Sequence, residues 1–242
     1  MKQFFKMMFA SVLGVFVAIG LITVISVVSL IGMAASLGSE SGYSPKPNTV
    51  FKIKLDGTLS DNATENPFAV FMGETENVLS LKDLLKSIRI AKDNNNIQGI
   101  YLEAKWLNTG SASLEALRRA LIDFKESSKF VVAYSDTYTQ GAYFLCSVAD
   151  KVFLNPQGSL NLVGLNSETM FYKGLLNKLG IQMQIFKVGT YKGAVEPFML
   201  DKLSDANREQ INSYLNSIWG NITEGIAESR HITVRDINHF AN

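Results

Sequence analysis

The sequence has little of what marks several common classes of protein. It contains a single cysteine, Cys146, so an intramolecular disulfide is excluded and the cysteine count says nothing about the redox compartment. The net charge is only +1, and a chain without a basic surplus is not expected to bind nucleic acid. The two histidines form no HExxH motif, CxxC is absent, and no glycine-rich nucleotide motif occurs. We therefore expect no metal and no cofactor.

What the sequence does have is one long apolar run near its N-terminus. Residues 7–35 carry no charge, and about 20 apolar residues are enough for a helix to cross a bilayer. Lys2 and Lys6 precede the run, so the positive-inside rule puts the short N-terminus in the cytoplasm and the rest outside. The alternative is a cleaved signal peptide, but its apolar stretch is shorter, about 7–15 residues. The sequence predicts a single-pass anchor over residues 1–36, in the cytoplasmic membrane of a bacterium.

The remaining chain alternates between two hydrophobic periods. After a Gly/Ser/Pro-rich linker at 37–48, residues 49–242 form about 200 residues, enough for one buried core. Period-two runs predict strands and period-3.6 runs predict helices, and their alternation predicts an α/β fold with parallel strands. Ser80 and Thr233 are the expected N-caps of two of the helices. The predicted strands are 49–55, 99–103, 130–134, 151–154 and 182–188, the helices 80–93, 113–126, 140–149, 170–179 and 205–230, and 62–77 is a loop.

One segment could carry chemistry. In FKVGTYKGAVEPF, residues 186–198, a predicted strand runs into Lys192, which lies between aromatic and small residues. Burial there would disfavour the charged amine and make it a usable general base. The spacing alone, however, favours a solvated surface lysine over a partly buried base. Cys146 lies in an apolar helix and is expected to be a buried core residue rather than a nucleophile.

The lysine segment strongly resembles a motif of the signal peptide peptidase A family, peptidase family S49, in its long two-domain form. Residues 149–165 and 204–215 resemble the neighbouring segments of that family, and the N-terminal anchor agrees. The resemblance implies a crotonase/ClpP-like fold of repeated ββα units and a serine–lysine dyad. It implies that Lys192 is the general base. The implied substrates are hydrophobic peptides left after signal-peptide removal.

The sequence departs from this family at the position of the nucleophile. The family pattern A-S-G-G-Y corresponds here to TQGAY, which puts Gln140 where the serine would be. An amide cannot attack a peptide carbonyl as a serine does. The oxyanion turn, expected within 104–110, keeps only Gly110. Ser135, Ser147 and Ser159 lie outside the nucleophile frame and are expected to be structural.

Both departures are typical of the N-terminal domain of the long form. The resemblance then implies that residues 49–242 supply the lysine, that a C-terminal domain absent from this sequence supplies the serine, and that the protein forms a tetramer on the membrane. We expect the reading frame to continue past Asn242. Two alternatives stay open. Gln140 also suits a non-catalytic, membrane-anchored scaffold or pseudo-protease, and the crotonase fold also hosts acyl-CoA enzymes, although an outward-facing domain would meet no acyl-CoA.

Overall fold

The structure is a computed structural model that describes residues 2–38, 44–62 and 77–241. It divides into two compact units, Met1–Pro45 and Lys46–Asn242. Residues 63–76 of the predicted loop and 39–43 of the predicted linker lie outside the described residues.

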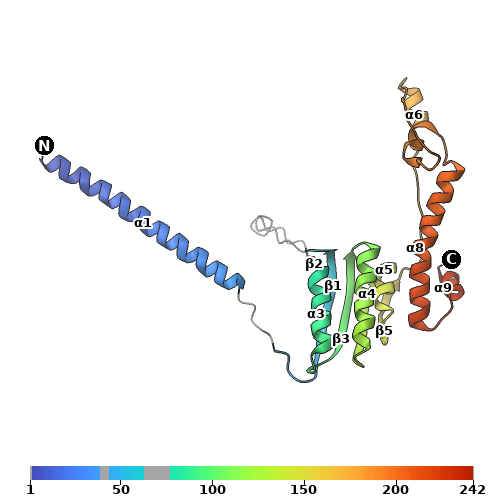
Figure 1. The fold of residues 1–242 in the computed structure, drawn as a ribbon, viewed down its shortest axis with the longest axis horizontal. Helices are drawn as coiled ribbons and strands as arrows, with labels where there is room; N and C mark the ends of the chain where they lie inside the picture. The colour runs from blue at the N-terminus through green and yellow to red at the C-terminus, as the bar shows by residue number, and fades with distance from the viewer. Residues whose placement is uncertain (1, 39–43, 63–76, 242) are drawn as a thin grey trace. The chain divides into compact units, whose positions relative to one another are not determined.

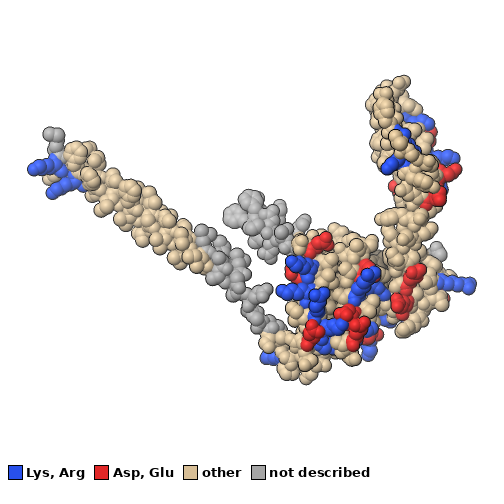
Figure 2. Space-filling view, in the orientation of Figure 1, with Lys and Arg blue, Asp and Glu red and all other residues tan. Residues whose placement is uncertain are grey.

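The first unit contains one long helix, α1 (Lys2–Gly38). Its stretch Lys2–Ser29 is long and apolar enough to cross a membrane, a test of length and composition that a signal sequence also meets. Lys2 and Lys6 provide the only charges of α1, at its N-terminal end (Figures 1 and 2). The Thr23 hydroxyl donates to the carbonyl of Ile19 at 2.9 Å, so this polar group is satisfied within its own helix. The predicted apolar N-terminal helix is therefore present.

The second unit is built on a five-stranded parallel sheet. The strand order is β2-β1-β3-β4-β5, and all four neighbouring pairs are parallel. The α/β class predicted from the sequence is confirmed. The strands are β1 (Thr49–Ser60), β2 (Val78–Ser80), β3 (Ile97–Asn108), β4 (Phe130–Tyr138) and β5 (Lys151–Leu160).

Three helices connect the strands and bury the core. They are α3 (Leu81–Asp93), α4 (Ser111–Lys125) and α5 (Gln140–Cys146). The Ser80 hydroxyl accepts from the backbone N–H of Asp83, which confirms the predicted cap of α3. Alternate residues of the strands, such as Ile100 and Leu102 of β3, are completely buried together with Leu121 of α4. The sheet therefore shows the inward–outward alternation from which its strands were predicted.

Two strands continue past the points where the sequence predicted their ends. Asp56-Gly57 was expected to end the first strand and Asn155-Pro156 the fourth, but β1 reaches Ser60 and β5 reaches Leu160. Both strands pass these points through irregular register instead of a turn. Gly57 has φ of 107°, and a Cβ there would overlap the carbonyl oxygen of Asn77. Turn-type residues serve here as bulges, where they bend a strand without ending it.

The predicted strand at 182–188 is wrong. That segment has no regular structure, although its neighbours are helical where the sequence predicted helices. A strand is stabilised by pairing with another strand, and no strand of the described chain pairs with these residues. The remaining elements are α6 (Lys173–Lys178), the 3₁₀ turn η1 (Gly193–Val195), α7 (Glu196–Met199), α8 (Asp205–Arg230) and α9 (Val234–Phe240).

Residues 161–222, which we call the arm, differ from the rest of this unit. The arm contains α6, η1, α7 and most of α8, and its α6 end lies away from the sheet (Figure 1). The structure describes every residue of the arm, and Glu196 is the one that is buried. Phe186 and Val188 are 86% and 88% exposed. The C-terminal part of α8, by contrast, buries Thr223 and Ile226 against the sheet and its helices α3, α4 and α5, which we call the sheet domain.

Candidate active site and family

Lys192 lies in the arm, at the end of the irregular segment that replaces the predicted strand. The chain turns at Gly189, whose φ of 95° favours glycine, and Lys192 then directly precedes η1. The side chain of Lys192 is exposed. The described residues therefore do not supply the burial that the sequence-based mechanism requires of a neutral lysine.

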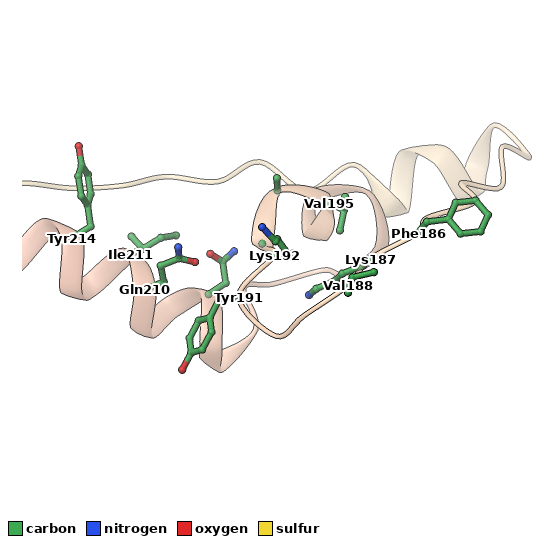
Figure 3. A pocket seen from close by; sticks show the side chains of 12 residues that line it. Phe186, Lys187, Val188, Tyr191, Lys192, Val195, Gln210, Ile211 and Tyr214 are labelled. Atoms are coloured by element: carbon green, nitrogen blue, oxygen red, sulfur yellow. The ribbon is translucent and has the colours of Figure 1, made fainter.

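The Lys192 side chain lies on the wall of an open groove of about 810 Å³. One wall is the segment from Phe186 to Val195, and the other is the first part of α8, including Ile211 and Tyr214 (Figure 3). The lining is mostly apolar, and the amine of Lys192 points toward the α8 side of the groove. The groove thus combines an apolar wall with a primary amine. Its lining residues are Phe186, Lys187, Val188, Tyr191, Lys192, Gly193, Ala194, Val195, Asn207, Gln210, Ile211 and Tyr214.

Glu196 holds the two walls of this groove together. Its Oε1 accepts from the Ser204 hydroxyl at 2.6 Å, and its Oε2 accepts from the Ser204 N–H at 3.1 Å and the Asn207 amide at 3.0 Å. Ser204 is the N-cap of α8, and its hydroxyl also accepts from the N–H of Asn207. Glu196 follows Lys192 by four residues, and its carboxylate therefore fixes the first turn of α8 close to the lysine segment.

This network lowers the pKa of the Glu196 carboxyl to about 2, mainly through the hydrogen bond from the Ser204 hydroxyl and then through the Ser204 N–H, Asn207 and Lys187. Burial opposes this shift without reversing it. Glu196 belongs to the lysine motif, but the motif alone predicted no role for it. The signal that could have found it is the N-capping serine eight residues downstream, at the start of a strongly predicted helix.

Gly193 is required by the same arrangement. A Cβ at Gly193 would lie 2.3–2.5 Å from the side-chain atoms of Asn207, too close for any real contact. A larger residue would displace the Asn207 side chain, which would then lose its hydrogen bond to Glu196. The small residue after Lys192 is thus needed for the hydrogen bonds that place α8 beside the lysine.

Two lysines line the groove, and they have different surroundings. Lys187 Nζ lies 3.6 Å from Glu196 Oε1 and so forms an ion pair with the buried carboxylate. The ion pairs found in the described chain do not include Lys192. Of the two lysines that line the groove, Lys187 is thus the one whose amine contacts the buried carboxylate of Glu196.

The structure places Gln140 away from this groove. Gln140 is the first residue of α5, and its side-chain oxygen accepts from the N–H of Gly164 at 3.2 Å. The N-cap of α5 is Thr139, whose hydroxyl accepts from the N–H of Ala142. The groove beside Lys192 is lined by the arm alone, so this part of the structure does not bring the lysine together with α5.

The other hydroxyl and thiol groups near α5 are structural. Ser135 and Ser147 are buried, and each donates to a backbone carbonyl, that of Ala104 and that of Phe144 respectively. Burial raises the pKa of the Cys146 thiol to about 12, so a thiolate nucleophile is excluded there. The expectation that Cys146 is a core residue is confirmed. In the described residues, no group of three or more His, Cys, Asp or Glu is placed to hold a metal ion.

Arg118 attaches α8 to the sheet domain and was missed by the sequence analysis. It lies on α4 and is buried, and its guanidinium donates to the Phe144 carbonyl at 2.6 Å and the Ser147 hydroxyl at 2.9 Å. It also donates to the Gly225 carbonyl and, at 2.6 Å, to the Ser229 hydroxyl of α8. Burial lowers the pKa of the guanidinium, although an arginine stays charged in a protein. One buried side chain therefore ties α4, α5 and α8 together.

Comparison with known proteins identifies the family. The model of peptidase family S49 matches residues 123–242. Protease 4 of Salmonella typhi is 36% identical over 198 residues, which cover 79% of this chain and 30% of that protein. Protease 4 of Haemophilus influenzae is 34% identical over 187 residues, covering 74% of this chain and 30% of that protein. The chain thus spans about 30% of the length of these curated relatives.

A solved structure of an enoyl-CoA hydratase/isomerase family protein from Silicibacter pomeroyi is 11% identical, with a TM-score of 0.30 over 80% of this chain and 91% of that chain. The two curated relatives named above are proteases, and both the lysine segment and α8 lie within the region that the family model matches. The chain is therefore a member of peptidase family S49.

Proposed function

We propose that this chain is part of a membrane-anchored serine endopeptidase that works by a Ser/Lys dyad, with Lys192 as the general base and the nucleophilic serine on a C-terminal domain. The observation that carries the proposal is the position of Lys192 on the wall of an apolar groove, outside the ion pairs of the described chain. Gln140 at the nucleophile position explains why the serine must come from elsewhere. The chain is matched to only about 30% of the length of its relatives, which leaves room for such a domain.

The chemistry follows from the neutral amine. The Lys192 amine takes the proton of the serine hydroxyl while the serine oxygen attacks the peptide carbonyl carbon. The proton then passes to the departing amine as the C–N bond breaks, which leaves an acyl-enzyme. Water, deprotonated by the same lysine, hydrolyses the ester and restores the serine. The dyad thus returns to its starting state.

The neutral state of Lys192 requires cover that the arm does not provide. The arm exposes large apolar side chains on both sides of the lysine in the sequence, among them Val188 before it and Phe198 after it. A serine-bearing domain packed on these residues would bury the amine and disfavour its charged form. We propose that such packing occurs in a homo-oligomer, with a tetramer as the expected assembly.

The substrates that suit this site are hydrophobic peptides. The groove has a mostly apolar lining, which favours extended segments with apolar side chains. An anchor through α1 would hold the groove outside the cytoplasmic membrane, where peptides remain after signal-peptide cleavage. Digestion of these peptides is the proposed role.

The test compares two lysine variants of the protein encoded by the complete reading frame, in detergent, on a fluorogenic hydrophobic peptide ester. Lys192→Arg keeps the positive charge but cannot act as a base, so we expect turnover to fall by about 10²–10⁴-fold. Lys187→Arg changes the other lysine of the groove in the same way, and we expect it to keep most of the activity. Equal activity in the two variants would refute the assignment.

A second prediction concerns the 242-residue chain by itself. Without a serine in the nucleophile frame, we expect it to hydrolyse the same ester no faster than buffer does. Turnover that depends on Lys192 in this chain would contradict the two-domain mechanism. An inactive complete protein would instead support the non-catalytic scaffold, which Gln140 favours as the second candidate.

A further inference from the structure

The arm is attached to the sheet domain at both of its ends, and α5 takes part in both attachments. At the start of the arm, the backbone N–H of Asn161 donates to the Tyr138 carbonyl at 2.9 Å. The N–H of Gly164 then donates to the side-chain oxygen of Gln140, the first residue of α5, at 3.2 Å. At the end of the arm, Arg118 connects α8 to the C-terminal end of α5. One short helix therefore holds both segments of chain that form the arm.

Between these two attachments the arm makes its hydrogen bonds within itself. In the described chain, those of residues 165–218 join parts of the arm to one another, as in the network around Glu196. Apolar contact with the core occurs at the two ends, where Leu162 and Ile222 pack against it. The direction of the arm is therefore decided by the contacts at its ends.

The two ends of the arm lie close together. The outgoing segment at Gly164 and the returning helix at Trp219 line one cavity of about 250 Å³. The backbone at Gly164 has φ of 78°, so the chain turns there in a conformation that favours glycine. The Gln140 side chain holds this turn from the sheet-domain side. A change at the turn is passed along the arm, which carries Lys192.

The length of the Gln140 side chain is essential for this contact. Its acceptor oxygen lies three bonds beyond Cβ, whereas the hydroxyl oxygen of a serine is bonded to Cβ directly. A serine at this position of α5 would leave the N–H of Gly164 without that acceptor. The position can therefore carry a nucleophile or this acceptor, but one residue cannot serve as both.

We propose that Gln140 is a positioning residue, whose side-chain oxygen holds the start of the arm on α5 and thereby fixes where the arm presents Lys192. The inference rests on the proposed function, because it takes Lys192 as the general base. A base that receives a proton from a serine on another domain must be placed to within about 1 Å. The arm has no apolar core of its own to supply this precision, since Glu196 is the residue that it buries.

The first experiment measures the direction of the arm in the 242-residue chain in detergent. Nitroxide labels are attached to the variants Lys86→Cys in α3 and Lys178→Cys in α6, both at exposed positions, while the buried Cys146 stays unlabelled. Double electron–electron resonance then gives the distribution of distances between the two labels. The width of this distribution reports how firmly the arm is held on the sheet domain.

We expect a narrow distribution in the parent chain and in Gln140→Glu, which keeps an acceptor oxygen at the same reach. In Gln140→Leu, which is of similar size but has no acceptor, the distribution should be roughly twice as wide. Gln157→Leu changes an exposed glutamine of β5 in the same way and should leave the distribution narrow. An equally narrow distribution in Gln140→Leu, or equally wide ones in the two Gln140 variants, would overturn the proposal.

The second experiment measures how kcat/KM of the complete protein for the peptide ester depends on pH. In Gln140→Leu we expect a fall of about tenfold, because the base is misplaced. The rise of activity with pH should also move to higher pH, since a lysine that is less well covered is harder to deprotonate. A loss of folded protein alone would lower the rate without moving this profile. Gln140→Glu should keep both the rate and the profile.

The two proposals fail on different results. An unchanged rate and pH profile in Gln140→Leu would overturn the positioning role, while inactivity of Lys192→Arg would still support the general base. Full activity of Lys192→Arg would refute the general base, and the label distances would still decide whether Gln140 holds the arm.

Discussion

Different forces stabilise the sheet domain and the arm. The sheet domain buries alternate strand residues such as Ile100 and Ala133 under α3 and α4, and this core is apolar. The arm buries one residue, and that residue is the charged Glu196. The surface of the sheet domain mixes charges of both signs (Figure 2). The comparison teaches that the hydrophobic effect shapes the first region, whereas a few polar contacts shape the region that carries Lys192.

The largest expected effect on stability comes from removing the Arg118 hydrogen bonds that connect α8 to the sheet domain. Arg118→Met removes the guanidinium that donates to Phe144 and Ser147 on one side and to Gly225 and Ser229 on the other. The Phe144 carbonyl would keep its bond from the Ser147 hydroxyl, but the other acceptors would lose the guanidinium as their donor, and we expect the free energy of unfolding to fall by about 3 kcal/mol. Chemical unfolding of the 242-residue chain in detergent, followed by circular dichroism, measures this change.

The neighbouring residue provides the control for this prediction. Arg119 is exposed and pairs only with Glu115 on the same helix, so Arg119→Met should cost about 0.5 kcal/mol or less. Equal losses in the two variants would show that the buried network does not join α8 to the sheet domain.

A smaller and more local effect is expected in the arm. Glu196→Gln replaces one acceptor oxygen with an amide that donates, although three donors from Ser204 and Asn207 converge there. We expect a local loss of about 2 kcal/mol. Hydrogen exchange should be faster in the first turn of α8 and unchanged in β3 and β4. Glu209→Gln, on the exposed face of α8, should leave the exchange of that turn nearly unchanged.

The smallest effect is a dependence on pH. The pKa of Glu196 is lowered to about 2 from an ordinary value of 4.5, so its contribution to stability is complete above about pH 4.5 and is lost as the pH falls toward 2. The difference in arm exchange between the native chain and Glu196→Gln should therefore be constant from pH 7 to pH 5 and shrink below about pH 4. A difference that stays constant down to pH 3 would mean that the carboxylate charge is not what fixes the arm.

Elements with a strong local signal were predicted well from the sequence. The helix at 205–230 was predicted from its amphipathic pattern, with the bounds that α8 has. Thr233, which was also predicted to cap a helix, caps α9 and forms a capping box with Asp236. Local patterns fix such elements because the deciding contacts lie within four residues.

Elements that depend on distant partners were predicted poorly. The strand expected at 182–188 has suitable residues but no partner strand, and the irregular ends of β1 and β5 read locally as turns. Lys192 is exposed, as its spacing alone favoured, whereas the strand predicted before it would have been half-buried. Pairing and burial are decided between segments that are far apart in the chain.

The sequence by itself determined the α/β class, the apolar N-terminal helix, the family and the choice of Lys192 as the residue to examine. Each of these follows from composition, from short-range periodicity or from a contiguous motif. Only the tertiary structure decided that Glu196 fixes the start of α8 beside that lysine and that Arg118 joins α8 to the sheet domain. The physical reason is that a buried charge is defined by what surrounds it, and those surroundings are assembled from segments that the linear sequence keeps apart.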